Sequence, residues 1–89
     1  MTSMIYTISE LCYEQVVAQS ISMKIICPEF CESLMLTIAK EYLHFGLNSE
    51  WMFYVKNNSQ IIDWEFVSET VIDMMDNDGH LYSEYCSWG

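Results

Sequence analysis

The stretch that decides the fold is PEFCESLMLTIAKEYLHFG, residues 28 to 46. Pro28 suits the first turn of a helix, where a missing N–H costs no hydrogen bond, and Gly46 is the usual left-handed residue that ends one. Between them, apolar residues recur at three- and four-residue spacing and form one face: Phe30, Cys31, Leu34, Met35, Ile38, Tyr42 and Phe45. We therefore predict a helix over 28–45 at the centre of the core.

This helix also has apolar residues off its main face. Leu36 and Leu43 are seven positions apart and lie well away from the predicted stripe. They indicate a second buried side, which either a long-range core contact or another copy of the chain could cover.

Two further helices are predicted on either side of 28–45. Thr7 and Glu10 in "TISE" match a capping box, which predicts a helix over 8–19. The helical period returns at 61 and continues to about 77, where "NDG" ends it.

Two connecting segments are ambiguous from the sequence. Residues 20–27 fit either a strand or a continuation of the first helix, and 50–64 fit either a hairpin around "KNNS" or another helix. The fold is thus predicted to be mainly α, a small single-domain bundle of three to four helices. The alternative is an α+β fold with a short hairpin near 50–64 packed on helices 8–19, 28–45 and 61–77.

The chain is both apolar and acidic. Its 89 residues are 52% hydrophobic with a net charge of −10, which predicts a folded protein rather than an acidic tail. One proline and three glycines leave no visible linker, so 1–89 is expected to be a single compact domain, with the aromatic segment 80–89 as a last short helix or a docked or flexible tail. A domain this small hides only about 60–65% of its surface. We therefore expect apolar surface for a partner or a homo-oligomer, most simply a dimer.

Cations are scarce and arginine is absent. Lys24, Lys40 and Lys56 are the only basic residues besides two histidines. Nucleic-acid backbones and anionic membranes are bound by clustered Lys and Arg, so we expect no direct contact with nucleic acid or membrane. The N-terminus has neither the basic flank nor the long apolar run of a signal peptide, which predicts a cytoplasmic protein, in the host cytoplasm if it is viral.

The sequence does not predict a metal site, a cofactor or an enzyme. A zinc site usually has two close ligand pairs, but Cys27 and Cys31 form the only pair, and the four cysteines are expected to be reduced and to pack as small apolar residues. "DNDG" resembles part of a calcium loop, but alignment on Gly79 places Met74 and Tyr85 at the first and last ligand positions. Neither His44 nor His80 has a nucleophile or carboxylate at a suggestive spacing.

The notable surface feature is an acidic stripe on the helix predicted over 61–77. At 100° per residue, Glu65, Glu69, Asp73 and Asp76 fall within about 80° of one another, and the opposite face is apolar: Trp64, Val67, Val71, Met74 and Met75. The stripe puts like charges four residues apart and carboxylates at a helix C-terminus, and both arrangements are unfavourable. We therefore predict a partner-binding surface, extended by Asp78 and Glu84. The alternative is a solvated face that serves only solubility.

These properties predict a small acidic inhibitor that binds a basic nucleic-acid-handling protein or complex. In size, charge and lack of arginine, the chain resembles small phage proteins that imitate nucleic acid and inactivate restriction enzymes, CRISPR effectors or host nucleases. No motif accompanies this resemblance, so it assigns no residue. The alternative is a helical interaction adaptor that docks through an apolar patch or through the aromatic tail with Leu81, Tyr82, Tyr85 and Trp88.

Overall fold

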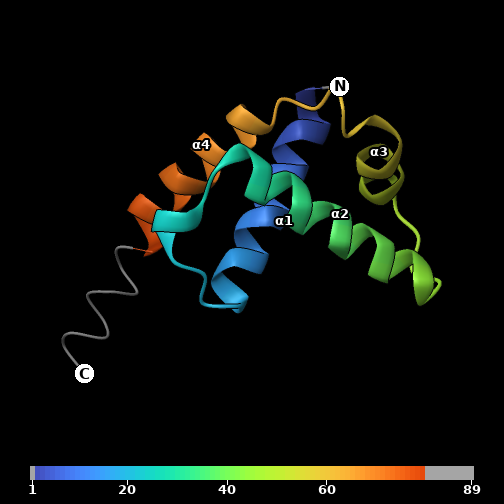
Figure 1. The fold of residues 1–89 in the computed structure, drawn as a ribbon, viewed down its shortest axis with the longest axis horizontal. Coiled ribbons are helices and arrows are strands. Elements are labelled where there is room, and N and C mark those ends of the chain that lie inside the picture. Colours follow the sequence, from blue (N-terminus) through green and yellow to red (C-terminus); the bar gives the residue numbers. More distant parts are fainter. Residues whose placement is uncertain (1, 80–89) are drawn as a thin grey trace.

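The computed structural model describes residues 2–79, and within that range it contains helices and no strand (Figure 1). The elements in chain order are α1 (Thr2–Ala18), the short 3₁₀ turn η1 (Met23–Ile25), α2 (Pro28–His44), α3 (Glu50–Asn58), α4 (Trp64–Met74) and the π-helical turn η2 (Met75–Gly79). The predicted mainly α bundle is confirmed. The hairpin alternative near 50–64 is wrong, because its first half is the helix α3.

The first helix is longer than the sequence predicted. α1 begins at Thr2, so Thr7 lies inside the helix and the predicted capping box does not mark its start. The extra turn contains Met4 and Ile5, which are partly buried against the core, and this contact favours continuing the helix toward the N-terminus. The buried hydroxyl of Ser9 donates to the carbonyl of Ile5 at 2.8 Å, as serine often does inside a helix.

Residues 20–27 are neither a strand nor a continuation of α1. Ser20 has φ of 55°, and backbone bonds from Ser20 to Val17 and from Ile21 to Val16 close the helix in a Schellman motif. The chain then makes the η1 turn, where Ser22 Oγ accepts from the amide of Lys24 at 3.2 Å. A left-handed serine therefore ends α1 where the sequence has no glycine to mark the stop.

The second helix matches the predicted range closely. α2 runs from Pro28 to His44, and Gly46 has φ of 77° with the same pair of closing bonds, from Gly46 to Leu43 and from Leu47 to Tyr42. No Cβ-bearing residue adopts this conformation easily, which explains the glycine. α2 packs against each of the other three helices, as its predicted central place requires.

The apolar face of α2 is buried for most of its length but not at its C-terminal end. Cys31, Met35 and Ile38 are buried, whereas Tyr42 is 36% and Phe45 is 74% exposed. Figure 1 shows that the last turns of α2 extend past α1 and α4, and in this part Tyr42 packs edge to face on Trp51 of α3 at 5.6 Å. The predicted apolar face therefore extends beyond the core at its C-terminal end, where Phe45 is exposed to solvent.

The off-face residues of α2 reach the core of the same chain. Leu36 and Leu43 are partly buried and pack against the central cluster. The second buried side predicted from the sequence is therefore covered by long-range contacts within the chain.

The connection from α3 to α4 fixes where the last helix begins. The indole Nε1 of Trp64 donates to the carbonyl of Ser59 at 2.8 Å, and Asp63 Oδ1 accepts from the amide of Phe66 at 3.0 Å. These bonds start α4 at Trp64, three residues later than predicted, and its α-helical part ends at Met74 before the wider η2 turn.

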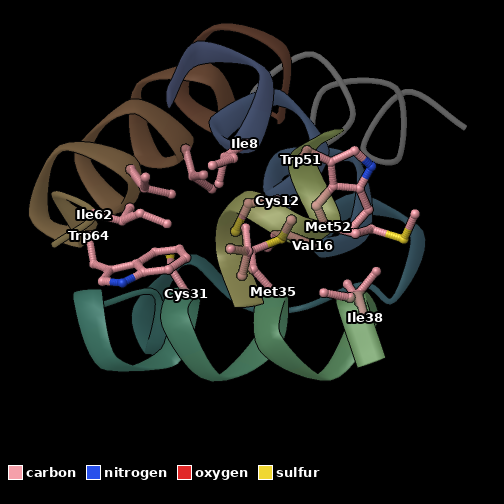
Figure 2. Close-up of a cluster of buried hydrophobic side chains, with 14 of the residues drawn as sticks. Ile8, Cys12, Val16, Cys31, Met35, Ile38, Trp51, Met52, Ile62 and Trp64 are labelled. Atoms are coloured by element: carbon pink, nitrogen blue, oxygen red, sulfur yellow. The ribbon is translucent and has the colours of Figure 1, made fainter. Parts of the chain in front are cut away.

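The core fills the space between the four helices. Figure 2 shows this cluster, with side chains from α1, α2, α3 and α4 and from the α3–α4 connection. Within residues 2–79, no helix combines the length and the apolar character needed to cross a membrane.

Candidate partner-binding surface

The acidic stripe lies on the outer side of α4. Trp64, Val67 and Val71 of the same helix are buried in the core, while Glu65, Glu69, Asp73 and Asp76 are all exposed. The predicted division of α4 into an apolar and an acidic face is therefore confirmed. Asp76 lies just beyond α4, in the η2 turn.

The stripe is regular, and no cation among residues 2–79 neutralises it. Glu65, Glu69 and Asp73 follow one another at one helical turn, about 6 Å along the axis, so the three span about 12 Å. No ion pair joins any residues from 2 to 79, so these carboxylates lie in solvent without a lysine beside them. The like charges at four-residue spacing are thus not offset by local cations.

Charge is segregated between the helices as well as along the sequence. α1 packs mainly against α4, with the rings of Tyr6 and Phe66 edge to face at 5.4 Å. Together these two helices carry five carboxylates and neither lysine nor arginine: Glu10, Glu14, Glu65, Glu69 and Asp73. The three lysines are exposed on other elements, Lys24 on η1, Lys40 on α2 and Lys56 on α3. The α1–α4 pair is therefore the acidic part of the bundle.

Two of the acids near the stripe have a structural explanation. Asp63 caps α4 through its bond to Phe66, and Glu65 follows in the first turn, where the helix dipole favours a negative charge. This cap was not predicted from the sequence, although an aspartate directly before an apolar period is the usual signal for one. Glu69, Asp73 and Asp76 have no such explanation, and we call these three the stripe core.

The far end of the predicted surface is only partly described. Asn77 Nδ2 donates to the carbonyl of Asp73 at 3.0 Å, which satisfies one backbone acceptor where α4 ends. Asp78 belongs to the η2 turn. Glu84, and the aromatic tail with Leu81, Tyr82, Tyr85 and Trp88, lie outside the described residues.

The cysteines and histidine of the described chain do not converge on a metal. Cys27 is exposed before α2 and Cys31 is buried inside it, while His44 is thirteen residues further along the same helix, or about 20 Å away. Among residues 2–79, no three potential ligands lie close enough to hold an ion. His80 and Cys86 lie outside this range.

Comparison with known proteins matches the chain to no family model, no curated protein and no solved structure.

Proposed function

We propose that the protein is a small acidic inhibitor that imitates nucleic acid and occupies the basic groove of a nucleic-acid-handling protein, in the manner of phage anti-restriction or anti-CRISPR proteins. One observation carries the proposal. The stripe core is exposed along α4 and the following η2 turn, it forms no ion pair with any residue of 2–79, and the opposite face of α4 is anchored in the core. A negative surface held in this way can meet a basic groove without first reorganising.

The stripe has a lower density of negative charge than a nucleic-acid strand, so it would imitate nucleic acid only in part. Carboxylates at about 6 Å spacing carry roughly half the charge of one nucleic-acid strand, which has one phosphate per 3.4 Å. The two exposed glutamates of α1, Glu10 and Glu14, add to the negative field of the helix pair. A dimer that presented two stripes would approach the charge of a duplex more closely.

The test compares two variants with the same change in net charge. The stripe variant Glu69→Gln/Asp73→Asn/Asp76→Asn neutralises the stripe core. The matched control Glu29→Gln/Glu41→Gln/Glu50→Gln removes three carboxylates from α2 and α3. After capture and identification of a partner from lysate, each protein is measured against the purified partner, with labelled DNA or RNA as competitor.

The wild type and the control variant are expected to displace the nucleic acid, and the stripe variant to associate at least about tenfold more slowly at low salt. Its association rate should also depend less steeply on salt. Equal binding by the stripe variant, an equal loss in the control, or a ternary complex of partner, protein and nucleic acid would each contradict the proposal.

A second candidate function is an adaptor that docks through apolar side chains. It is favoured by the exposed end of α2, where Phe45 is 74% and Leu47 is 55% exposed. Apolar docking changes little between low and moderate salt, and Phe45→Ala should weaken it, while the stripe variant should bind normally. The two variants thus separate the two candidate functions.

A further inference from the structure

Exposed apolar side chains gather at the C-terminal end of α2. Tyr42, Phe45 and Leu47 are three of the eight large apolar residues that are exposed within residues 2–79, and they lie close together in the sequence. The backbone holds them in place, because the amide of Leu47 donates to the carbonyl of Tyr42 at 2.8 Å and the ring of Tyr42 packs on the buried Trp51. We call Tyr42, Phe45 and Leu47 the α2 patch.

The α2 patch lies in a part of the chain that carries no net charge. Residues 40–58 contain two lysines and two glutamates, all exposed, although the whole chain has a net charge of −10: Lys40, Glu41, Glu50 and Lys56. Figure 1 places α4, which carries the stripe core, toward the opposite end of the long axis from the end of α2. The exposed apolar surface is therefore bordered by charges of both signs and lies away from the acidic stripe.

This distribution of charge indicates which partner fits the α2 patch. A basic partner is attracted to the negative field of the α1–α4 pair and gains little from a neutral surface. Two copies of the chain repel each other through that field, and they repel least where their neutral ends meet. In a two-fold contact the same surface lies on both sides, so each copy brings a lysine, Lys40, and a carboxylate, Glu41, to the border of the interface.

We propose that the α2 patch is the interface of a two-fold dimer of this chain. Phe45 is its main contact, because it is 74% exposed and an aromatic side chain buries about 150–250 Å². Three side chains from each copy make an interface smaller than the roughly 1,200 Å² at the lower limit for stable complexes, so the dimer forms at micromolar concentration and dissociates on dilution. The α1–α4 pair of each copy stays outside the contact.

Sedimentation equilibrium of the full chain over about 1–200 μM measures the dimer directly. Phe45→Asp should raise the Kd at least about tenfold, because it puts a charge into the apolar contact on both sides. The matched control is Ile61→Asp, which makes the same change in charge at a residue that is 75% exposed but lies after α3, at the far end of that helix from the α2 patch. It should leave the Kd within about twofold, because a single exposed charge outside the interface is screened by solvent and salt.

A second pair of variants tests the role of charge. Lys40→Glu and Lys24→Glu each replace an exposed positive charge by a negative one. Lys40 borders the α2 patch, whereas Lys24 lies on η1, before the start of α2 and about 25 Å from its end. Only Lys40→Glu should weaken the dimer, by about fivefold or more. Circular dichroism of all four variants checks that the helices are retained.

A wild type that stays monomeric over this concentration range would overturn the proposal, as would a monomer that binds an unrelated protein through Phe45. A dimer that Phe45→Asp leaves intact, or that each control weakens as much as its matched variant, would also overturn it. Sedimentation needs no partner protein, so this inference stands or falls independently of the proposed inhibitory function.

Discussion

Neutralising the stripe core should stabilise the fold at low ionic strength. The stripe variant relieves two like-charge pairs, Glu65 with Glu69 and Glu69 with Asp73, each worth about 0.2–0.5 kcal/mol. It also removes the carboxylates of Asp73 and Asp76 from the C-terminal end of α4, where the helix dipole disfavours each by about 0.3–1 kcal/mol. All these residues are exposed, so solvent screens the interactions, and the expected stabilisation is the lower end of the summed range, about 1 kcal/mol. For a domain of this size the Tm should rise by about 4–8 °C.

Thermal unfolding followed by circular dichroism at about 10 mM and at 1 M salt measures this effect. The Debye length falls from about 30 Å to about 3 Å between these conditions, so the gain should largely vanish at high salt. The matched control is Asp63→Ala at the other end of α4. It loses the capping bond to Phe66 and should be less stable by about 0.5–2 kcal/mol at low salt, with much of the loss persisting at high salt.

A stripe variant that melts below the wild type at low salt would refute the reasoning. So would a gain of the same size in 1 M salt, because an electrostatic gain at exposed sites cannot survive that screening. Either result would mean that these carboxylates take part in interactions that stabilise the fold.

Three further predictions concern the core, the thiols and the exposed end of α2. Met35→Ala should cost about 2–5 kcal/mol in chemical denaturation, because Met35 is fully buried, whereas Phe45→Ala should change stability by less than about 0.5 kcal/mol. In a Cys86→Ser background, Ellman's reagent should modify the exposed Cys27 rapidly and the buried Cys12 and Cys31 only after denaturation, and three fast thiols in the native protein would contradict the packing. Sedimentation at micromolar concentration should detect a species heavier than the 10.5 kDa monomer, and Phe45→Asp should return it to the monomer, because the exposed apolar end of α2 offers a surface for self-association.

Much of the helical architecture is encoded locally and could be read from the sequence. Pro28 and Gly46 mark the two ends of α2. Proline has no backbone N–H and therefore fits the first helical turn, and glycine has no Cβ and therefore adopts the left-handed conformation that ends the helix. The division of α4 into a buried and an acidic face follows directly from the helical period, which is why the exposure of Glu65, Glu69, Asp73 and Asp76 agrees with the prediction.

Other features depended on contacts between residues far apart in the sequence. Burial of Met4 and Ile5 extends α1 past the local capping signal at Thr7, and the path of α2 beyond its neighbours leaves Phe45 in solvent although its spacing is that of a core residue. Local periodicity specifies which side chains share a face, but it cannot specify how far a neighbouring helix covers that face.

The same distinction holds for the chemistry of the chain. The sequence alone determined that the protein is acidic, lacks arginine and concentrates its negative charge after residue 57, because these are properties of composition and order. Only the tertiary structure decided that the lysines lie off the α1–α4 pair, and that Cys12 and Cys31 are buried in the core while Cys27 is exposed. Each of these depends on how helices pack, and packing joins residues that no spacing along the chain relates.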